Sequence, residues 1–136
     1  MSPHELLNPN GLTPAVGFSH VVLPASGRLV FLAGQAAHLP DGTIEGESMV
    51  EQFETAARNV VTALEAAGAA SRDLVSMQIF VTDMEEYRAS RRAIGRVYRK
   101  AFGGHYPAVS LFEVEGLFDP LAKVELVCVA VASQGG

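Results

Sequence analysis

Cysteine and tryptophan are nearly absent from this chain of 136 residues. It contains one cysteine, Cys128, and no tryptophan. A single thiol excludes an internal disulfide framework and a cysteine metal cluster. No stretch approaches the run of about 18 consecutive apolar residues that a membrane-spanning helix needs. The first residues lack a basic start followed by an apolar run, so we expect no secretory signal and predict a cytoplasmic location.

Positive charge is also in short supply. The net charge of −5 argues against general nucleic-acid binding, which needs a basic face. Hydrophobic residues make up 49% of the chain and charged residues 18%, a balance typical of globular proteins with a high apolar share. A chain of this length is expected to form one domain, residues 1–136. Its few charges suit a subunit that hides surface against partners.

Two segments have the pattern of helices. Ser48 and Glu51 form a capping box, and an apolar stripe with helical spacing continues to Ala67. Gly68 follows where a left-handed cap belongs. A second helix is expected over residues 83–102. The pair of glycines that follows stops it.

Strands are expected where β-branched residues cluster between Gly and Pro. After an irregular arm, residues 1–17, the expected strands are 18–23 and 28–34 as a hairpin, then 71–82, 108–115 and 123–132. Within 71–82, alternation places Leu74 and Phe80 on one face and the other apolar residues, Val75, Met77, Ile79 and Val81, on the opposite face. The order β-β-α-β-α-β-β predicts an α+β fold with one mixed sheet and two helices on one face.

The last strand is apolar on both faces. Alternation places Leu126 and Cys128 on one side, and Glu125 with three valines on the other. Such a strand must be covered on both sides, and two helices cover only one face of a small sheet. We therefore expect a second copy of the chain to cover the other face, in an oligomer whose interface contains or borders Glu125.

Glu125 is the main candidate for chemistry. Carboxylates are rarely fully buried unless they are paired, and an apolar environment would raise the pKa of Glu125 toward the range useful for acid–base catalysis. The alternative is a structural ion pair with an Arg or Lys of a neighbouring strand or subunit. The sequence favours neither interpretation.

Other candidates are weaker. The histidines lack the spacing of metal ligands and are expected to be ordinary surface or loop residues, namely His4, His20, His38 and His105. Cys128 is expected to be a buried, inert thiol, and Gly34 suits a close approach of a ligand or another backbone. A solvated helix face is favoured over RNA binding for the basic residues of the second helix, Arg88, Arg91, Arg92, Arg96, Arg99 and Lys100.

Short motifs follow one another in a specific order along the chain: Asn8-Pro9, Gly34-Gln35 before an Asp-Gly turn, Gln52 and Asn59, Ala67-Gly68, Val81-Thr82-Asp83, Tyr98 with Phe102, Pro107-Ala108, Leu117 and Val124-Glu125. This series resembles the reactive intermediate deaminase family (RidA, also called YjgF) over about residues 8–132. The resemblance implies a chorismate-mutase-like subunit that assembles as a homotrimer with clefts between subunits.

The resemblance also implies an activity, the hydrolysis of reactive enamines and imines derived from amino acids, with release of ammonia and no cofactor. In the family, an Arg after the Pro-Ala pair binds the substrate carboxylate, a Glu on the last strand positions or activates water, and a Tyr on the first strand lines the cleft. This chain keeps Glu125 but has Val109 and Phe18 at the other two positions. Ala33 stands where many members have Ser, and Gly95 where many have Asn.

The missing Arg bears most on the substrate. Charge-assisted hydrogen bonds contribute about 1.5–3 kcal/mol each, so we expect the change to Val109 to weaken binding of a 2-imino acid by two or more decades. Phe18, Ala33 and Val109 would make the cleft drier and more apolar than in other family members. Such a cleft suits a neutral or aromatic ligand. The predicted site has Glu125 as general acid–base and ligand contacts from Phe18, Ala33, Gly34, Tyr106, Ala108, Val109 and Ser110. No metal or cofactor is expected.

Hydrolysis of an enamine, imine or related compound other than the usual 2-imino acids is therefore the preferred function. A non-catalytic trimer that binds a small molecule in the same cleft is the alternative. RNA cleavage, which has only the Arg-rich second helix in its favour, ranks last. The sequence leaves open whether an Arg from a neighbouring subunit replaces the missing anchor.

Overall fold

Helix α1 (Met49–Ala66) begins at the expected capping box in the computed structural model, which describes residues 1–133. Ser48 Oγ accepts a hydrogen bond from the Glu51 amide at 3.1 Å, and Glu51 Oε1 accepts one from the Ser48 amide at 3.0 Å. Gly68 follows the helix with a φ of +72°, a conformation that favours glycine. The predicted first helix is confirmed.

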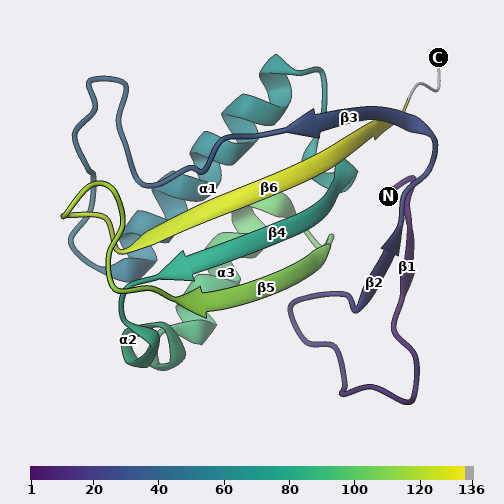
Figure 1. Cartoon of the computed structure of the whole chain (residues 1–136), viewed down its shortest axis with the longest axis horizontal. Coiled ribbons are helices and arrows are strands. Elements are labelled where there is room, and N and C mark those ends of the chain that lie inside the picture. Colours follow the sequence, from purple (N-terminus) through teal and green to yellow (C-terminus); the bar gives the residue numbers. More distant parts are fainter. Residues whose placement is uncertain (134–136) are drawn as a thin grey trace.

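Four strands form the main sheet, in the order β3 (Gly27–Phe31), β6 (Val124–Ser133), β4 (Leu74–Val81) and β5 (Ala108–Glu113). The sheet is mixed, because β4 and β5 are parallel while β6 runs antiparallel to both of its neighbours. Helices α1 and α3 (Arg91–Phe102) lie together on one face of it (Figure 1). The predicted α+β fold, with a mixed sheet and helices on one face, is confirmed.

The hydrophobic core lies between the helices and the sheet. Strand β6 contributes Leu126 and Cys128 to it, and Glu125 lies on the opposite face, as the alternation predicts. In β4, the pairing register shifts between Leu74 and Ser76, just after the short 3₁₀ turn η1 (Ser71–Asp73). The irregularity turns Leu74 into the core, where it is fully buried. Its predicted placement on the face of Phe80 is therefore wrong.

The N-terminal arm is more ordered than expected. It contains β1 (Glu5–Leu7), which pairs with β2 (Val21–Leu23) in a separate antiparallel sheet, while β3 pairs with β6. The predicted hairpin between strands 18–23 and 28–34 is therefore wrong. The arm is fixed by the buried ring of His4, whose Nε2 donates to the Asp73 carbonyl at 3.1 Å and whose Nδ1 accepts from the Ala25 amide at 3.0 Å.

The second helix is divided at Ser90 into α2 (Met84–Ala89) and α3. Ser90 has a ψ of 6°, and its amide donates to the carbonyls of both Glu86 and Tyr87, so the chain bends there. Helix α3 buries four side chains against α1 and the sheet, whereas α2 buries none. A single continuous helix over residues 83–102 is thus wrong in detail, although its termination at Gly103 is confirmed.

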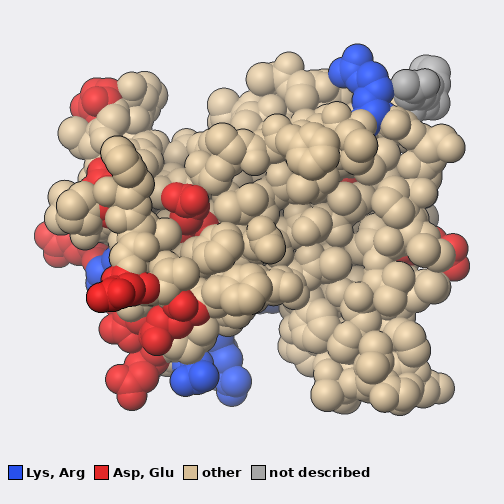
Figure 2. Space-filling model, in the orientation of Figure 1, with Lys and Arg blue, Asp and Glu red and all other residues tan. Residues whose placement is uncertain are grey.

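Charge is unevenly distributed over the surface. Carboxylates gather at the end of the sheet where β4 and β5 finish (Figure 2). All six basic residues of α2 and α3 are exposed, and Lys100 pairs with Glu54 of α1 at 3.2 Å. Among residues 1–133, no helix is both long enough and apolar enough to cross a membrane.

Candidate functional site

The face of the sheet opposite the helices is apolar and open. Register places Leu29 and Phe31 of β3 beside the valines of β6, and these two side chains are 65% and 73% exposed. On the other side of β6, Phe80 and Phe112 stack with their ring centroids 5.4 Å apart. Large exposed apolar patches of this kind mark interaction or ligand-binding surfaces.

Glu125 lies on this open face, with Phe80 beside it on β4. Its side chain rests against the backbone of Gly34, so closely that a Cβ added at Gly34 would lie 2.8 Å from the Glu125 carboxyl carbon. Among residues 1–133, the Glu125 carboxylate has no hydrogen bond or ion pair, and the nearby Lys123 pairs instead with Glu86 at 3.0 Å. Within one subunit, the structural ion pair considered above is thus not formed.

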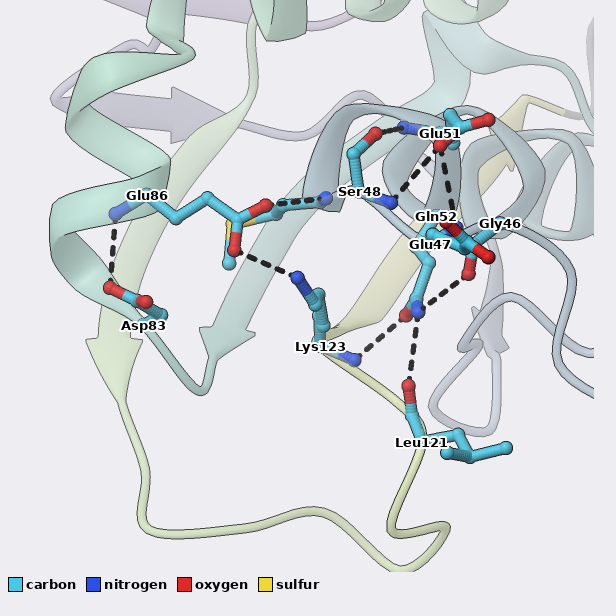
Figure 3. A network of polar contacts seen from close by, with 10 residues as sticks. Gly46, Glu47, Ser48, Glu51, Gln52, Asp83, Glu86, Leu121 and Lys123 are labelled. Atoms are coloured by element: carbon cyan, nitrogen blue, oxygen red, sulfur yellow. Dashed lines mark hydrogen bonds and ion pairs between the residues drawn. The ribbon is translucent and has the colours of Figure 1, made fainter.

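Helix α1 positions both segments that meet at this carboxylate. The buried Gln52 donates to the carbonyls of Gly46 and Leu121 at 3.1 and 3.0 Å, and accepts from the Lys123 amide at 2.7 Å, two residues before Glu125 (Figure 3). Because Gln52 satisfies three backbone groups at once, it fixes the entry into β6.

A second α1 amide fixes the other segment. Asn59 Nδ2 donates to the carbonyls of Ala36 and His38 at 3.0 and 2.9 Å. Just before them, Gln35 exchanges two backbone hydrogen bonds with Leu126, at 2.8 and 2.9 Å. The exposed Ala33 and Gly34 are thereby held beside Glu125, which brings three of the predicted site residues together.

A second group of predicted residues lies where β5 begins. The Ser19 amide donates to the Pro107 carbonyl at 2.9 Å, and Ser19 Oγ donates to the Tyr106 carbonyl at 2.6 Å. These bonds hold the segment that contains Phe18 against the start of β5, and the Phe18 ring makes an edge contact with His20 at a centroid distance of 4.9 Å. The Tyr106 ring stacks on Tyr98 with centroids 5.1 Å apart.

The two groups are not brought together within one subunit. Glu125 is paired with Phe80, whereas Ala108 is paired with Ser76, four residues earlier on β4. At about 3.3 Å per residue, the groups are separated by roughly 13 Å along the strands. Ser110 lies between them, on the same face as Glu125.

Within a single subunit, Val109 does not lie where a ligand contact beside Glu125 would have to lie. It is paired with Met77, whose side chain is fully buried on the helix face, and it packs against the core. The side chain at position 109 therefore starts on the face opposite Glu125.

Two histidines differ from expectation. His4 and His105 lie in loop segments, as expected, but they are only 7% and 9% exposed and so are not surface residues. Each donates Nε2 to a carbonyl distant in sequence, which explains the burial. Within residues 1–133, no three His, Cys, Asp or Glu side chains are grouped as a metal site would need. The buried thiol of Cys128 is confirmed, and burial raises its pKa to about 12.

Sequence reasoning missed the aromatic pair beside Glu125 and the open side chains of β3. Phe80 is expected in a strand without a role, and the sequence does not mark Phe112, Leu29 and Phe31 as site residues. The available signal is that segments 29–31 and 111–112 place apolar residues on both faces of a strand. Their proximity to Glu125 depends on strand order, which alternation does not determine.

The structure thus defines a small α+β subunit with an unpaired carboxylate on an open, apolar sheet face. The family model described as Endoribonuclease L-PSP matches residues 9–132. The chloroplastic Reactive Intermediate Deaminase A of Arabidopsis thaliana is 33% identical over 104 residues, covering 75% of this chain; the chain spans about half (52%) of that relative.

Solved structures agree. A protein of unknown function from the Rid family of Yersinia pestis, YyfB, has a TM-score of 0.85 at 29% identity and covers 94% of this chain and 98% of its own. Escherichia coli TdcF with bound serine has a TM-score of 0.67 at 28% identity, covering 93% and 94%. The chain belongs to the RidA/YjgF family, the family described as Endoribonuclease L-PSP.

Proposed function

We propose that this protein hydrolyses an enamine, imine or related C–N compound with release of ammonia, and that Glu125 is its general acid–base. The supporting observation is the partly buried carboxylate, which lies unpaired against Gly34 on an apolar face. The name of the Arabidopsis relative supports the same reaction class. No cofactor is required for the reaction.

The site is completed by a second copy of the chain in a homotrimer. The Glu125 group and the Phe18 group lie at different positions along one sheet, and the face between them is apolar and open. Packing copies side by side over this face would cover the exposed Leu29 and Phe31. It would also bring the Glu125 group of one subunit to the Phe18 group of the next.

The substrate lacks the carboxylate of a 2-imino acid. On the open face, strands β3, β4, β5 and β6 carry no Lys or Arg among the described residues. The stacked Phe80 and Phe112 supply an apolar wall beside Glu125 instead. This lining favours a neutral, aromatic substrate.

The reaction needs one group that gives and takes a proton. Protonated Glu125 would donate to the enamine carbon, which converts the enamine into an iminium ion. The Glu125 carboxylate would then accept a proton from water as the water oxygen bonds to the iminium carbon. Proton transfer to nitrogen breaks the C–N bond, giving ammonia and a carbonyl product. An imine substrate would instead take the proton of Glu125 on its nitrogen, which gives the iminium ion directly, and then follow the same steps.

The test compares two imines formed in situ. An amino-acid oxidase acting on alanine supplies 2-iminopropanoate, and a flavin amine oxidase acting on benzylamine supplies a neutral aryl imine. We expect ammonia release above the spontaneous rate for the aryl imine, little acceleration for 2-iminopropanoate, and loss of about 10²–10⁴-fold in Glu125→Gln. Full activity in Glu125→Gln would refute the assigned role.

Binding without turnover is the second candidate, because the same apolar lining would retain a neutral ligand without reacting. It predicts saturable binding of benzaldehyde, the hydrolysis product of the aryl imine, with no acceleration of either imine. Acceleration of 2-iminopropanoate equal to that of the aryl imine would mean that a cation from a neighbouring subunit binds the carboxylate.

A further inference from the structure

A groove lies next to the first residues of the chain and the segment that leads into β5. It is a groove of about 710 Å³ between the N-terminal arm and the turn that follows α3. Its lining includes Leu6, Arg72, Phe102, Gly104 and His105, and none of the site residues discussed above.

His105 lines this groove and has one ring nitrogen without a partner among residues 1–133. The side chain is only 9% exposed, and Nε2 donates to the Leu74 carbonyl at 2.8 Å, which leaves the lone pair on Nδ1. Nδ1 has no hydrogen-bond partner among residues 1–133. Because no fully buried side-chain nitrogen or oxygen in that range lacks a partner, Nδ1 must retain access to solvent. It is a hydrogen-bond acceptor held on a rigid ring.

Arg72 supplies a positive charge to the same groove. Its side chain is exposed and forms no ion pair within residues 1–133, and no carboxylate lines the groove. The adjacent Asp73 is buried and accepts from the Ala70 amide at 2.9 Å, so it does not compete for the guanidinium.

The walls of the groove are preformed. Ser2 Oγ donates to the Arg72 carbonyl at 2.7 Å and accepts from the His4 amide at 3.1 Å, and the His4 ring ties the arm to Asp73. The buried Phe102 and Leu6 of β1 supply apolar lining. A preformed groove loses little entropy on binding.

We propose that this groove binds a small organic acid with three features: a carboxylate for Arg72, an O–H or N–H donor for His105 Nδ1, and an apolar group for Phe102 and Leu6. A 2-hydroxy or 2-amino acid with an apolar side chain has all three. The site is separate from Glu125 and does not depend on the proposed function.

The test measures binding of 3-phenyllactate to the full-length protein by calorimetry and by NMR of the histidine rings. Two matched probes remove one feature each, since 3-phenylpropanoate lacks the hydroxyl group and 2-phenylethanol lacks the carboxylate. We expect saturable binding of 3-phenyllactate, with a perturbed His105 ring signal and weaker binding of both other probes.

Surface variants keep the test independent of folding. Arg72→Met should weaken 3-phenyllactate about tenfold or more, because it removes a charge-assisted pair. Gly104→Phe should block the groove, since a Cβ there meets nothing within 4 Å and the added ring has room to occupy it. Arg88→Met on α2 is the control and should bind like the unmodified protein.

His105→Gln preserves a donor for Leu74 while replacing Nδ1. It should reduce the preference for 3-phenyllactate over 3-phenylpropanoate. Absence of binding at millimolar concentration would overturn the proposal. So would binding that survives both Arg72→Met and Gly104→Phe, or that is lost in Glu125→Gln, because the ligand would then occupy another site.

Discussion

The two faces of the sheet contain similar residues and have different roles. On the helix face, Leu126 and Cys128 are no more than 1% exposed, and every neighbour is supplied by the same chain. On the open face, Leu29 and Phe31 are as apolar but mostly exposed. Hydrophobicity alone therefore does not distinguish a buried core position from an exposed position on the open face; the distinction depends on which face the helices cover.

The comparison also bears on the position of Glu125, the proposed catalytic group. A carboxylate among the helix-face residues would be desolvated without a partner, at a cost of several kcal/mol. At Glu125, the carboxylate lies at the edge of the open face, partly buried and able to meet a ligand or a second copy. The α1 amides Gln52 and Asn59 fix its surroundings without contacting it.

The largest predicted effect compares the stability that the helix face and the open face each contribute to the subunit. Leu126→Ala removes a fully buried side chain and leaves a cavity, so we expect the free energy of unfolding to fall by about 2–5 kcal/mol. Chemical denaturation measures the change. Leu29→Ala on the open face is the comparison, and it should lower subunit stability far less when subunits are dissociated. Equal losses would mean that the two faces do not differ as described.

The second prediction tests the open face itself. Phe31→Asp forfeits about 1.5–3 kcal/mol of apolar burial in the assembly and adds an unpaired charge there. We expect a trimer-to-monomer shift, measured by analytical ultracentrifugation. Arg28→Asp, three residues earlier on β3 and on its other face, should leave the trimer intact. A trimeric Phe31→Asp variant would show that other surfaces form the interface.

The sequence predicts local features of this fold well. The capping box at Ser48, the glycine stops at Gly68 and Gly103, and the two faces of β6 follow from nearest neighbours in the chain and are all present. Which strands pair with one another does not follow from neighbouring residues in the chain. The strand 18–23 pairs with the arm rather than with 28–34, because His4 fixes the arm through groups up to 69 residues away.

The candidate site likewise has features that follow from neighbouring residues and features that depend on strand pairing. Alternation assigns Glu125 to a face, but its contact with Gly34 requires the pairing of Gln35 with Leu126. The placement of Val109 opposite Glu125 depends on the parallel register of β5 with β4. Register is determined by packing across the whole sheet, which a single segment does not specify.

The third prediction concerns the contact between Gly34 and Glu125. Gly34→Ala places a methyl group where the carboxylate lies, so the side chain of Glu125 must move. Because displacement of a catalytic group by about 1 Å costs about 10²-fold in rate, we expect ammonia release to fall by up to that factor with unchanged stability. Gly116→Ala, where a methyl group meets nothing within 4 Å, is the matched control. Unchanged activity in Gly34→Ala would argue against a catalytic Glu125.

The smallest predicted effect uses pH to probe the burial of Cys128 on the helix face. Burial raises the pKa of the Cys128 thiol to about 12, whereas an unfolded thiol has a pKa near 8.5. Below about pH 8.5 both states hold the proton, so the full stability is present. Above it, the unfolded state loses its proton first, and the free energy of unfolding should fall by about 1.4 kcal/mol per pH unit until the folded thiol titrates. Denaturation at pH 8 and pH 10 measures the difference. Cys128→Ala should be less stable at both values but should lose less between them, and an equal loss in the two proteins would show that the thiol is accessible to water rather than enclosed beneath the helices.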